Sequence, residues 1–172
     1  MQTTTLAKIQ KRSVALYPEV VSLYKIYNKL IHPHLNNLHL KFEEKSALTK
    51  ILVCVKNDNT LFLTHNFFLF CLLKGSNISD KVLEQEVSLV EINTDLFRFE
   101  LVFYELIGMV SRYHNLIELE KIYTAIHKLL NPEINHILFA KNNFSIALFC
   151  NLINLPERTY HNRTNRKRAK AH

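Results

Sequence analysis

NLIELEKIYTAIHKLLN, residues 115–131, has the clearest helical periodicity in this chain. Its large apolar side chains recur every three or four residues, which places them along one side of an α-helix. They are Leu116, Leu119, Ile122, Tyr123, Ile126 and Leu130. The pattern predicts an amphipathic helix that packs against a core, and it favours an all-α fold class.

Similar patterns on both sides extend the helical prediction over most of the chain. Upstream, NTDLFRFELVFYELIGMVSRYH (93–114) predicts a long helix, because Asp95 lies near its start and Arg112 near its end, as the helix dipole favours. The other segments expected to be helical are residues 6–17, 18–30, 79–92, 132–140 and 144–153. With only 2 Gly in the chain, tight turns should be few. We therefore expect a compact helical bundle.

Residues 42–56 leave helix and strand open. The segment begins with acidic residues, as helices often do, and we interpret it as a helix. However, its last six residues, ILVCVK, are rich in β-branched side chains, and the turn-forming NDN and the apolar TLFLT follow. A short β-hairpin near 51–64 is therefore the alternative.

The length and composition indicate a globular protein with a separate basic end. The chain has 172 residues, of which 48% are apolar, so a substantial core can form. We expect a single-domain helical body at 1–142 and a distinct C-terminal segment at 143–172. The three cysteines are widely spaced and no signal peptide is recognisable, which predicts a reduced, cytoplasmic location.

The positive charge is concentrated at the C-terminal end. The net charge is +7, and residues 155–172 hold six Lys or Arg side chains against Glu157 alone. Such a cluster binds polyanions, with nucleic acid as the first candidate and an anionic membrane surface as the second. The end has no apolar face to insert into a bilayer. We therefore expect a nucleic-acid partner, DNA before RNA, and no membrane.

No arrangement of residues predicts an active site, a metal or a cofactor. Gly75 and Gly108 are isolated, whereas phosphate-binding loops need clustered glycines. His32, His34 and His39 could ligate zinc, but no Cys or Asp lies close by, which favours a loop of solvated histidines. The cysteines lie within apolar runs, as inert core thiols do. We expect no enzymatic activity.

The segment FCNLINLPERTYHNR, which begins at Phe149, has a distinctive order of side-chain types. Phe149 is large and apolar, Cys150 after it is small, and the apolar Ile153 follows three places later. Asn154 tolerates the left-handed backbone that a tight turn requires. The apolar Leu155 completes the turn.

This order resembles the helix-turn-helix of bacterial transcription regulators. Pro156 suits the first turn of the second helix, and Tyr160 lies where the motif has its inward apolar anchor. Three residues later the motif has a second apolar anchor, but this chain has Arg163, which is a departure. The resemblance covers about 20 residues at the C-terminal end.

The resemblance implies a DNA-binding regulator whose helical body forms a homodimer or binds a protein partner. In such a motif the exposed side of the second helix reads bases in the major groove. Here those residues are Arg158, His161, Asn162 and Asn165. The residues expected to hold phosphates are Arg166, Lys167, Arg168 and Lys170.

The alternative is a helical adaptor or subunit of a larger assembly. In that case the basic end is incidental or docks on an acidic patch of a partner, and residues 157–172 form a solvated tail. Nearly all of the apolar periodicity lies before Leu155. We therefore expect residues 1–154 to fold without the C-terminal segment.

Overall fold

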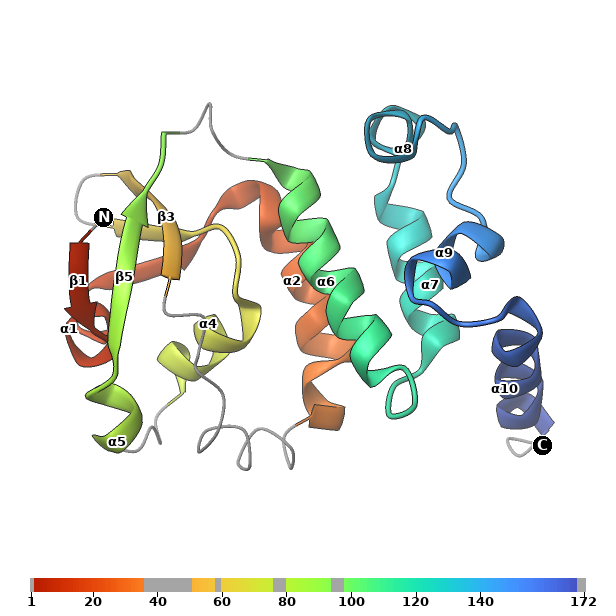
Figure 1. Ribbon diagram of the computed structural model, residues 1–172, viewed down its shortest axis with the longest axis horizontal. Helices are drawn as coiled ribbons and strands as arrows, with labels where there is room; N and C mark the ends of the chain where they lie inside the picture. The colour runs from red at the N-terminus through yellow and green to blue at the C-terminus, as the bar shows by residue number, and fades with distance from the viewer. Residues whose placement is uncertain (1, 36–50, 58–59, 76–79, 94–97, 170–172) are drawn as a thin grey trace. The chain divides into compact units, whose positions relative to one another are not determined.

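The computed structural model describes residues 2–35, 51–57, 60–75, 80–93 and 98–169 (Figure 1). The chain forms two compact units. Unit 1 comprises Met1–Tyr24 and Leu35–Val102, and unit 2 comprises Lys25–His34 and Phe103–His172. The expected boundary at 142/143 therefore falls inside unit 2. More of the described residues lie in helices than in strands, so the protein is mainly helical.

A five-stranded sheet in unit 1 shows that the all-α prediction is wrong. The strands run in the order β1-β5-β3-β4-β2. Their bounds are Gln2–Thr5 (β1), Ser13–Leu16 (β2), Ile51–Asn57 (β3), Thr60–Leu63 (β4) and Glu86–Glu91 (β5). β1 with β5 and β3 with β4 are antiparallel, whereas β3 with β5 and β2 with β4 are parallel.

The alternative of a hairpin near 51–64 is confirmed, and the helix expected at 51–56 is wrong. β3 and β4 pair in the antiparallel sense, with Cys54 opposite Leu63. Leu61 and Leu63 are buried while Phe62 between them is half-buried, which is the two-residue period of a strand. Residues 42–50 lie outside the described part of the chain.

Two other helical predictions are correct only for their first residues. Residues 6–17 begin as α1 (Leu6–Gln10) and continue as β2, and residues 80–92 begin as α5 (Asp80–Leu83) and continue as β5. In β5, Val87 and Leu89 are buried on either side of a less buried Ser88. Sheet pairing therefore overrides a weak helical pattern in both segments.

The core of unit 1 lies between the sheet and short helices. It includes Leu6 and Ile9 of α1, Leu69 and Leu73 of α4 (Phe67–Lys74), and Val82 of α5. Phe67 of α4 is also buried, whereas Phe68, Phe70 and Leu72 are half-buried. The connection from β2 passes through a short 3-10 helix, η1 (Pro18–Val20), into α2 (Val21–Leu30).

Unit 2 is helical. Its elements are the part of α2 from Lys25 onward, α6 (Phe99–Tyr113, whose first four residues belong to unit 1), α7 (Leu119–Leu129), α8 (Pro132–Phe139), α9 (Ile146–Leu152) and α10 (Glu157–Ala169). The helices expected at 93–114, 115–131, 132–140 and 144–153 are therefore present, although Asp95 lies outside the described residues. In the described part of the chain, no helix is long and apolar enough to cross a membrane.

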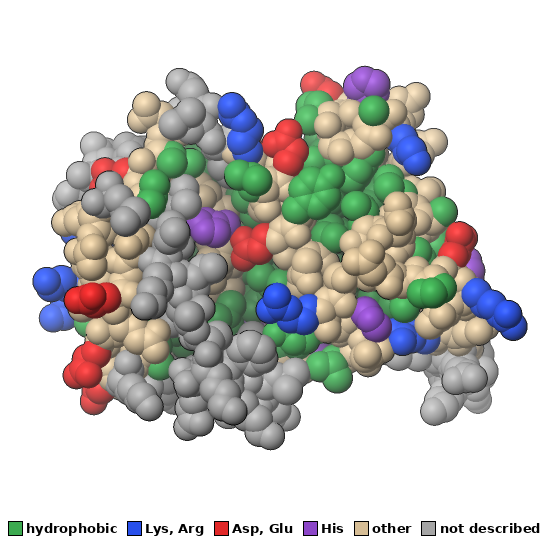
Figure 2. Space-filling model, viewed as in Figure 1, with side chains coloured by type: hydrophobic (Ala, Val, Ile, Leu, Met, Phe, Trp, Pro, Cys, Tyr) green, Lys and Arg blue, Asp and Glu red, His purple; other side chains and the backbone are tan. Residues whose placement is uncertain are grey.

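Aromatic side chains form the core of unit 2. Phe144, which precedes α9, stacks on Tyr123 of α7 at 5.9 Å between ring centroids. It also meets Phe103 of α6 and Phe149 of α9 edge-on at 6.4 and 6.1 Å. Other apolar side chains reach the surface of the molecule and are green in Figure 2. The aromatic cluster fixes α9 against α6 and α7, which positions the helix that follows.

Candidate nucleic-acid interface

The turn after α9 stops this helix with a left-handed residue. Asn154 has φ of 53°, as its place in the sequence predicts. Its N–H donates to the carbonyl of Asn151 (3.1 Å), and the N–H of Leu155 donates to the carbonyl of Cys150 (2.9 Å). These two bonds satisfy carbonyl groups at the helix end and reverse the chain. Pro156 then leads directly into α10.

The inner side of α10 is anchored by Tyr160. Tyr160 is only 3% exposed, and its ring lies edge-on to Phe149 at 6.1 Å and to Tyr123 at 6.4 Å. Phe149, Cys150, Ile153 and Leu155 are also buried. Residues 157–169 are therefore a packed helix rather than a solvated tail. Leu155 and Tyr160 are part of the core of unit 2, so the segment after residue 154 contributes to it. That residues 1–154 fold alone stays a prediction.

Arg163 occupies the position where the motif has its second apolar anchor, and it makes polar contacts instead. Its Nη1 lies 2.9 Å from Nδ1 of His114 and donates to the His114 carbonyl at 3.4 Å. The next residue, Thr164, is 9% exposed, and its hydroxyl donates to the carbonyl of His161 at 3.0 Å. Sequence reasoning missed His114, because it lies 49 residues away from Arg163 and no local pattern marks it.

The end of α6 also holds the turn itself. The hydroxyl of Ser111 donates to the carbonyl of Ile153 at 2.9 Å. Ser111 and His114 are one helical turn apart, so a single region at the end of α6 contacts both the turn and α10. Sequence reasoning also missed Ser111, since a serine within an apolar helix has no distinguishing local signal.

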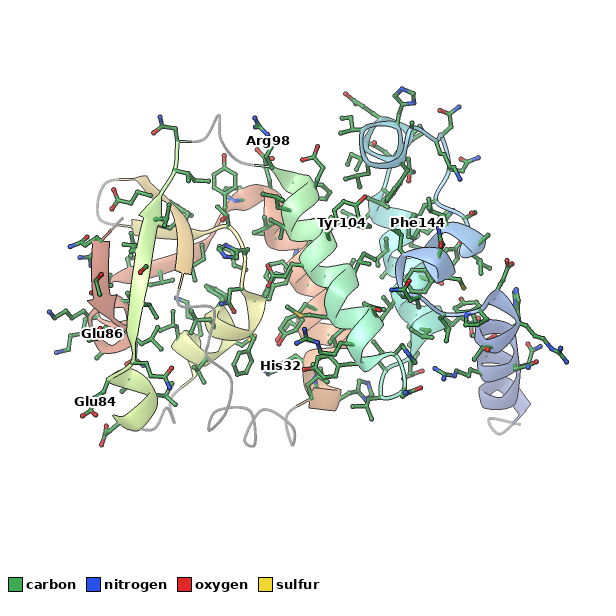
Figure 3. The ribbon with its side chains drawn as sticks, in the orientation of Figure 1. His32, Glu84, Glu86, Arg98, Tyr104 and Phe144 are labelled. Atoms are coloured by element: carbon green, nitrogen blue, oxygen red, sulfur yellow. The ribbon has the colours of Figure 1, made fainter. Side chains whose placement is uncertain are left out.

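The outer side of α10 is exposed and polar. The four side chains expected to read bases, Arg158, His161, Asn162 and Asn165, are all exposed. Their spacing of three, one and three residues places them along one face of the helix. Figure 3 shows side chains that project from the outer side of α10. Arg, His and Asn side chains on this face can donate and accept hydrogen bonds.

The charged residues of α10 are arranged along its axis. The acidic Glu157 lies in the first turn, where the helix dipole favours negative charge, and its Oε1 lies 3.5 Å from Nε2 of His161. Arg166, Lys167 and Arg168 lie in the last turns of the same helix. Lys170 lies outside the described residues.

The histidines and cysteines considered as reactive groups show no assembled site. Within the described residues, no group of three His, Cys, Asp or Glu side chains is placed to hold a metal ion, and His39 lies outside them. Burial raises the pKa of the Cys71 thiol, and burial together with the charge of Glu157 raises the pKa of the Cys150 thiol. A raised pKa leaves less of the reactive thiolate at neutral pH. Cys54 is fully buried.

Comparisons of the chain with protein-family models, curated proteins and solved structures gave no match. Its functional interpretation therefore depends on the geometry of α9 and α10. Together these helices hold a row of exposed donors and acceptors on a helix whose other side is packed. Such a face can recognise a flat or grooved polar surface.

Proposed function

We propose that the chain is a DNA-binding regulator in which α9 and α10 form a helix-turn-helix and α10 is the recognition helix. One observation carries this proposal. Tyr160 packs the inner side of α10 into unit 2, while Arg158, Asn162 and Asn165 form an exposed row on the outer side. A recognition helix needs both features, since a fixed orientation is what keeps base contacts in register.

The side chains of this row fit the edges of DNA bases. Arg donates two hydrogen bonds to guanine, and Asn forms a bidentate pair with adenine. The major groove of B-form DNA admits an α-helix, whereas that of A-form RNA is too deep and narrow for its bases to be read. This favours DNA over RNA as the partner of α10.

The basic residues after the row would hold the DNA backbone. Arg166, Lys167, Arg168 and Lys170 follow along the chain and carry positive charge. Contacts with phosphates add affinity and fix the register without reading sequence. A regulator of this type commonly binds as a homodimer on two half-sites, and we propose that role for the rest of the chain. We also propose a cytoplasmic location, in keeping with three cysteines that are widely spaced in the sequence.

The experiment that tests this function measures the salt dependence of DNA binding by fluorescence anisotropy. The full chain should bind duplex DNA with an affinity that falls steeply between 50 and 200 mM salt. Each phosphate contact that is lost should reduce the log–log slope by about 0.9. The variant Arg166→Ala/Lys167→Ala/Arg168→Ala should therefore have a clearly shallower slope than the unmodified chain.

A matched control removes three exposed positive charges from unit 1. Lys8, Lys11 and Arg12 lie in or directly after α1 and are exposed. The variant Lys8→Ala/Lys11→Ala/Arg12→Ala has the same net charge as the α10 variant. It should keep the slope of the unmodified chain. Equal slopes for the two triple variants would show that α10 has no special part in binding.

An adaptor role is the second candidate, because three large apolar side chains are exposed on unit 2. Tyr104 is 44%, Leu116 is 48% and Ile137 is 63% exposed. Apolar side chains at a surface can contribute to a protein interface, although isolated ones are common. An adaptor would show weak DNA retention that does not depend on the charges of α10, so the same salt titration separates the two functions.

A further inference from the structure

The middle of α10 is held by polar groups rather than by an apolar anchor. Beside Arg163 and Thr164 lies a cavity of about 330 Å³, whose other walls include His114, Ile117 and Leu119. Apolar packing therefore does not fill the space at this level of the helix. The contacts of Arg163 with the ring and the carbonyl of His114 bridge α10 to the end of α6.

We propose that Arg163 positions the recognition helix by donating a hydrogen bond to the ring of His114, and that loss of this bond weakens base-specific DNA recognition. This inference rests on the proposed function. A guanidinium group has only donors, so its 2.9 Å contact with Nδ1 requires a lone pair on that atom. The imidazole must then carry its hydrogen on Nε2.

Other charged groups line the cavity beside His114 and Arg163. They are Glu118, Glu120 and Lys121, and Lys121 is paired with Glu118 at 3.0 Å. The wall therefore holds charges of both signs.

The informative quantity is the ratio of the affinity for a selected duplex to that for a random duplex. A change in charge alone leaves this ratio nearly unchanged, because phosphate contacts do not depend on sequence.

Two substitutions of His114 test its role as an acceptor. His114→Gln keeps an acceptor oxygen, whereas His114→Ala removes the acceptor. The affinity ratio of His114→Ala should be about 10- to 150-fold lower than that of the unmodified chain, the factor expected for one hydrogen bond to a charged group. His114→Gln should keep a ratio close to that of the unmodified chain.

A measurement without DNA distinguishes failure of this inference from failure of the proposed function. Protection of the amides of residues 157–165 against hydrogen exchange reports how firmly α10 is held. His114→Ala should lower this protection, and His114→Gln should keep it. If protection follows this pattern but no duplex is preferred, the positioning role stands and the proposed function is wrong. If a duplex is preferred and His114→Ala changes neither the ratio nor the protection, the positioning role is overturned.

Discussion

The backbone of Asn154 decides where α9 ends and in which direction α10 begins. Its φ of 53° lies in the left-handed region, which is costly for most residues and least so for Gly and Asn. Ala140 ends α8 with a similar φ of 52°. The sequence predicts the first of these turns but not the second, because an alanine gives no local signal of a left-handed conformation.

The cost of the left-handed turn can be measured with two asparagines of α9 and its turn. Asn154→Val should lower the free energy of unfolding by about 1–2 kcal/mol, because a β-branched side chain clashes with its own backbone at this φ. Asn151→Val, at an exposed helical position three residues earlier, should cost only a few tenths of a kcal/mol. Urea denaturation of both variants provides the comparison. An equal loss for the two would show that the turn does not depend on Asn154.

Among the elements, α10 depends on an unusually small apolar contact. Its thirteen residues include one large apolar side chain, Tyr160. Arg163 adds polar contacts from α10 to His114, whereas the hydroxyl of the buried Thr164 bonds within α10 itself. The helix should therefore be sensitive to the loss of a single ring and insensitive to the loss of its exposed charges.

Replacing Tyr160 tests whether the orientation of α10 matters for recognition. Tyr160→Ser should lose roughly 1–3 kcal/mol of discrimination between selected and random duplexes, because base contacts go out of register. Its affinity for random duplexes should change far less, since every positive charge is retained. Tyr160→Phe keeps the ring and should retain most of the discrimination.

A variant that removes two positive charges should show the opposite pattern to Tyr160→Ser. Lys167→Ala/Arg168→Ala should weaken binding to selected and random duplexes alike. The affinities of Tyr160→Ser, Tyr160→Phe and the charge variant for both duplexes are measured at equilibrium. Circular dichroism melts confirm that each variant is folded. If Tyr160→Ser behaves like the unmodified chain on both duplexes, α10 acts only as a basic segment.

The elements of unit 2 could be predicted from the sequence more fully than those of unit 1. The helices of unit 2 show their period within a single segment, as Ile122 and Ile126 do in α7. The strands β2 and β5 are short, and each is stabilised by pairing with a distant segment, such as Ser13 with Thr60 and Thr5 with Glu86. The spacing of apolar residues within one segment does not show which distant segment it pairs with. The hairpin could be considered as an alternative because β3 and β4 follow each other closely in the sequence.

Within the candidate site, local features were predictable and distant ones were not. The left-handed Asn154 and the exposed row on α10 follow from the order of residues along one segment. The contacts of Ser111 and His114 with this segment bridge 42 and 49 residues. These contacts become apparent only when α6 is placed beside the turn.

At the scale of the whole molecule, the proposed function divides the basic end into two parts. Residues Arg166 to Lys170 would supply affinity through charge, whereas the row from Arg158 to Asn165 would supply sequence preference. The rest of the chain is nearly neutral, so we do not expect it to hold phosphates or to read bases. The central claim is therefore that the row on α10 reads bases.

In vitro selection from random duplexes tests this claim most directly. The unmodified chain should enrich a defined sequence. Asn162→Ala/Asn165→Ala, which changes no charge, should lose about 1–3 kcal/mol of preference at each base pair that these side chains contact. Asn142→Ala/Asn143→Ala removes two exposed asparagines before α9 and should enrich the same sequence as the unmodified chain. The claim would be contradicted if the Asn162→Ala/Asn165→Ala variant enriched the same sequence with the same affinity ratio as the unmodified chain. It would also be contradicted if the unmodified chain enriched no sequence.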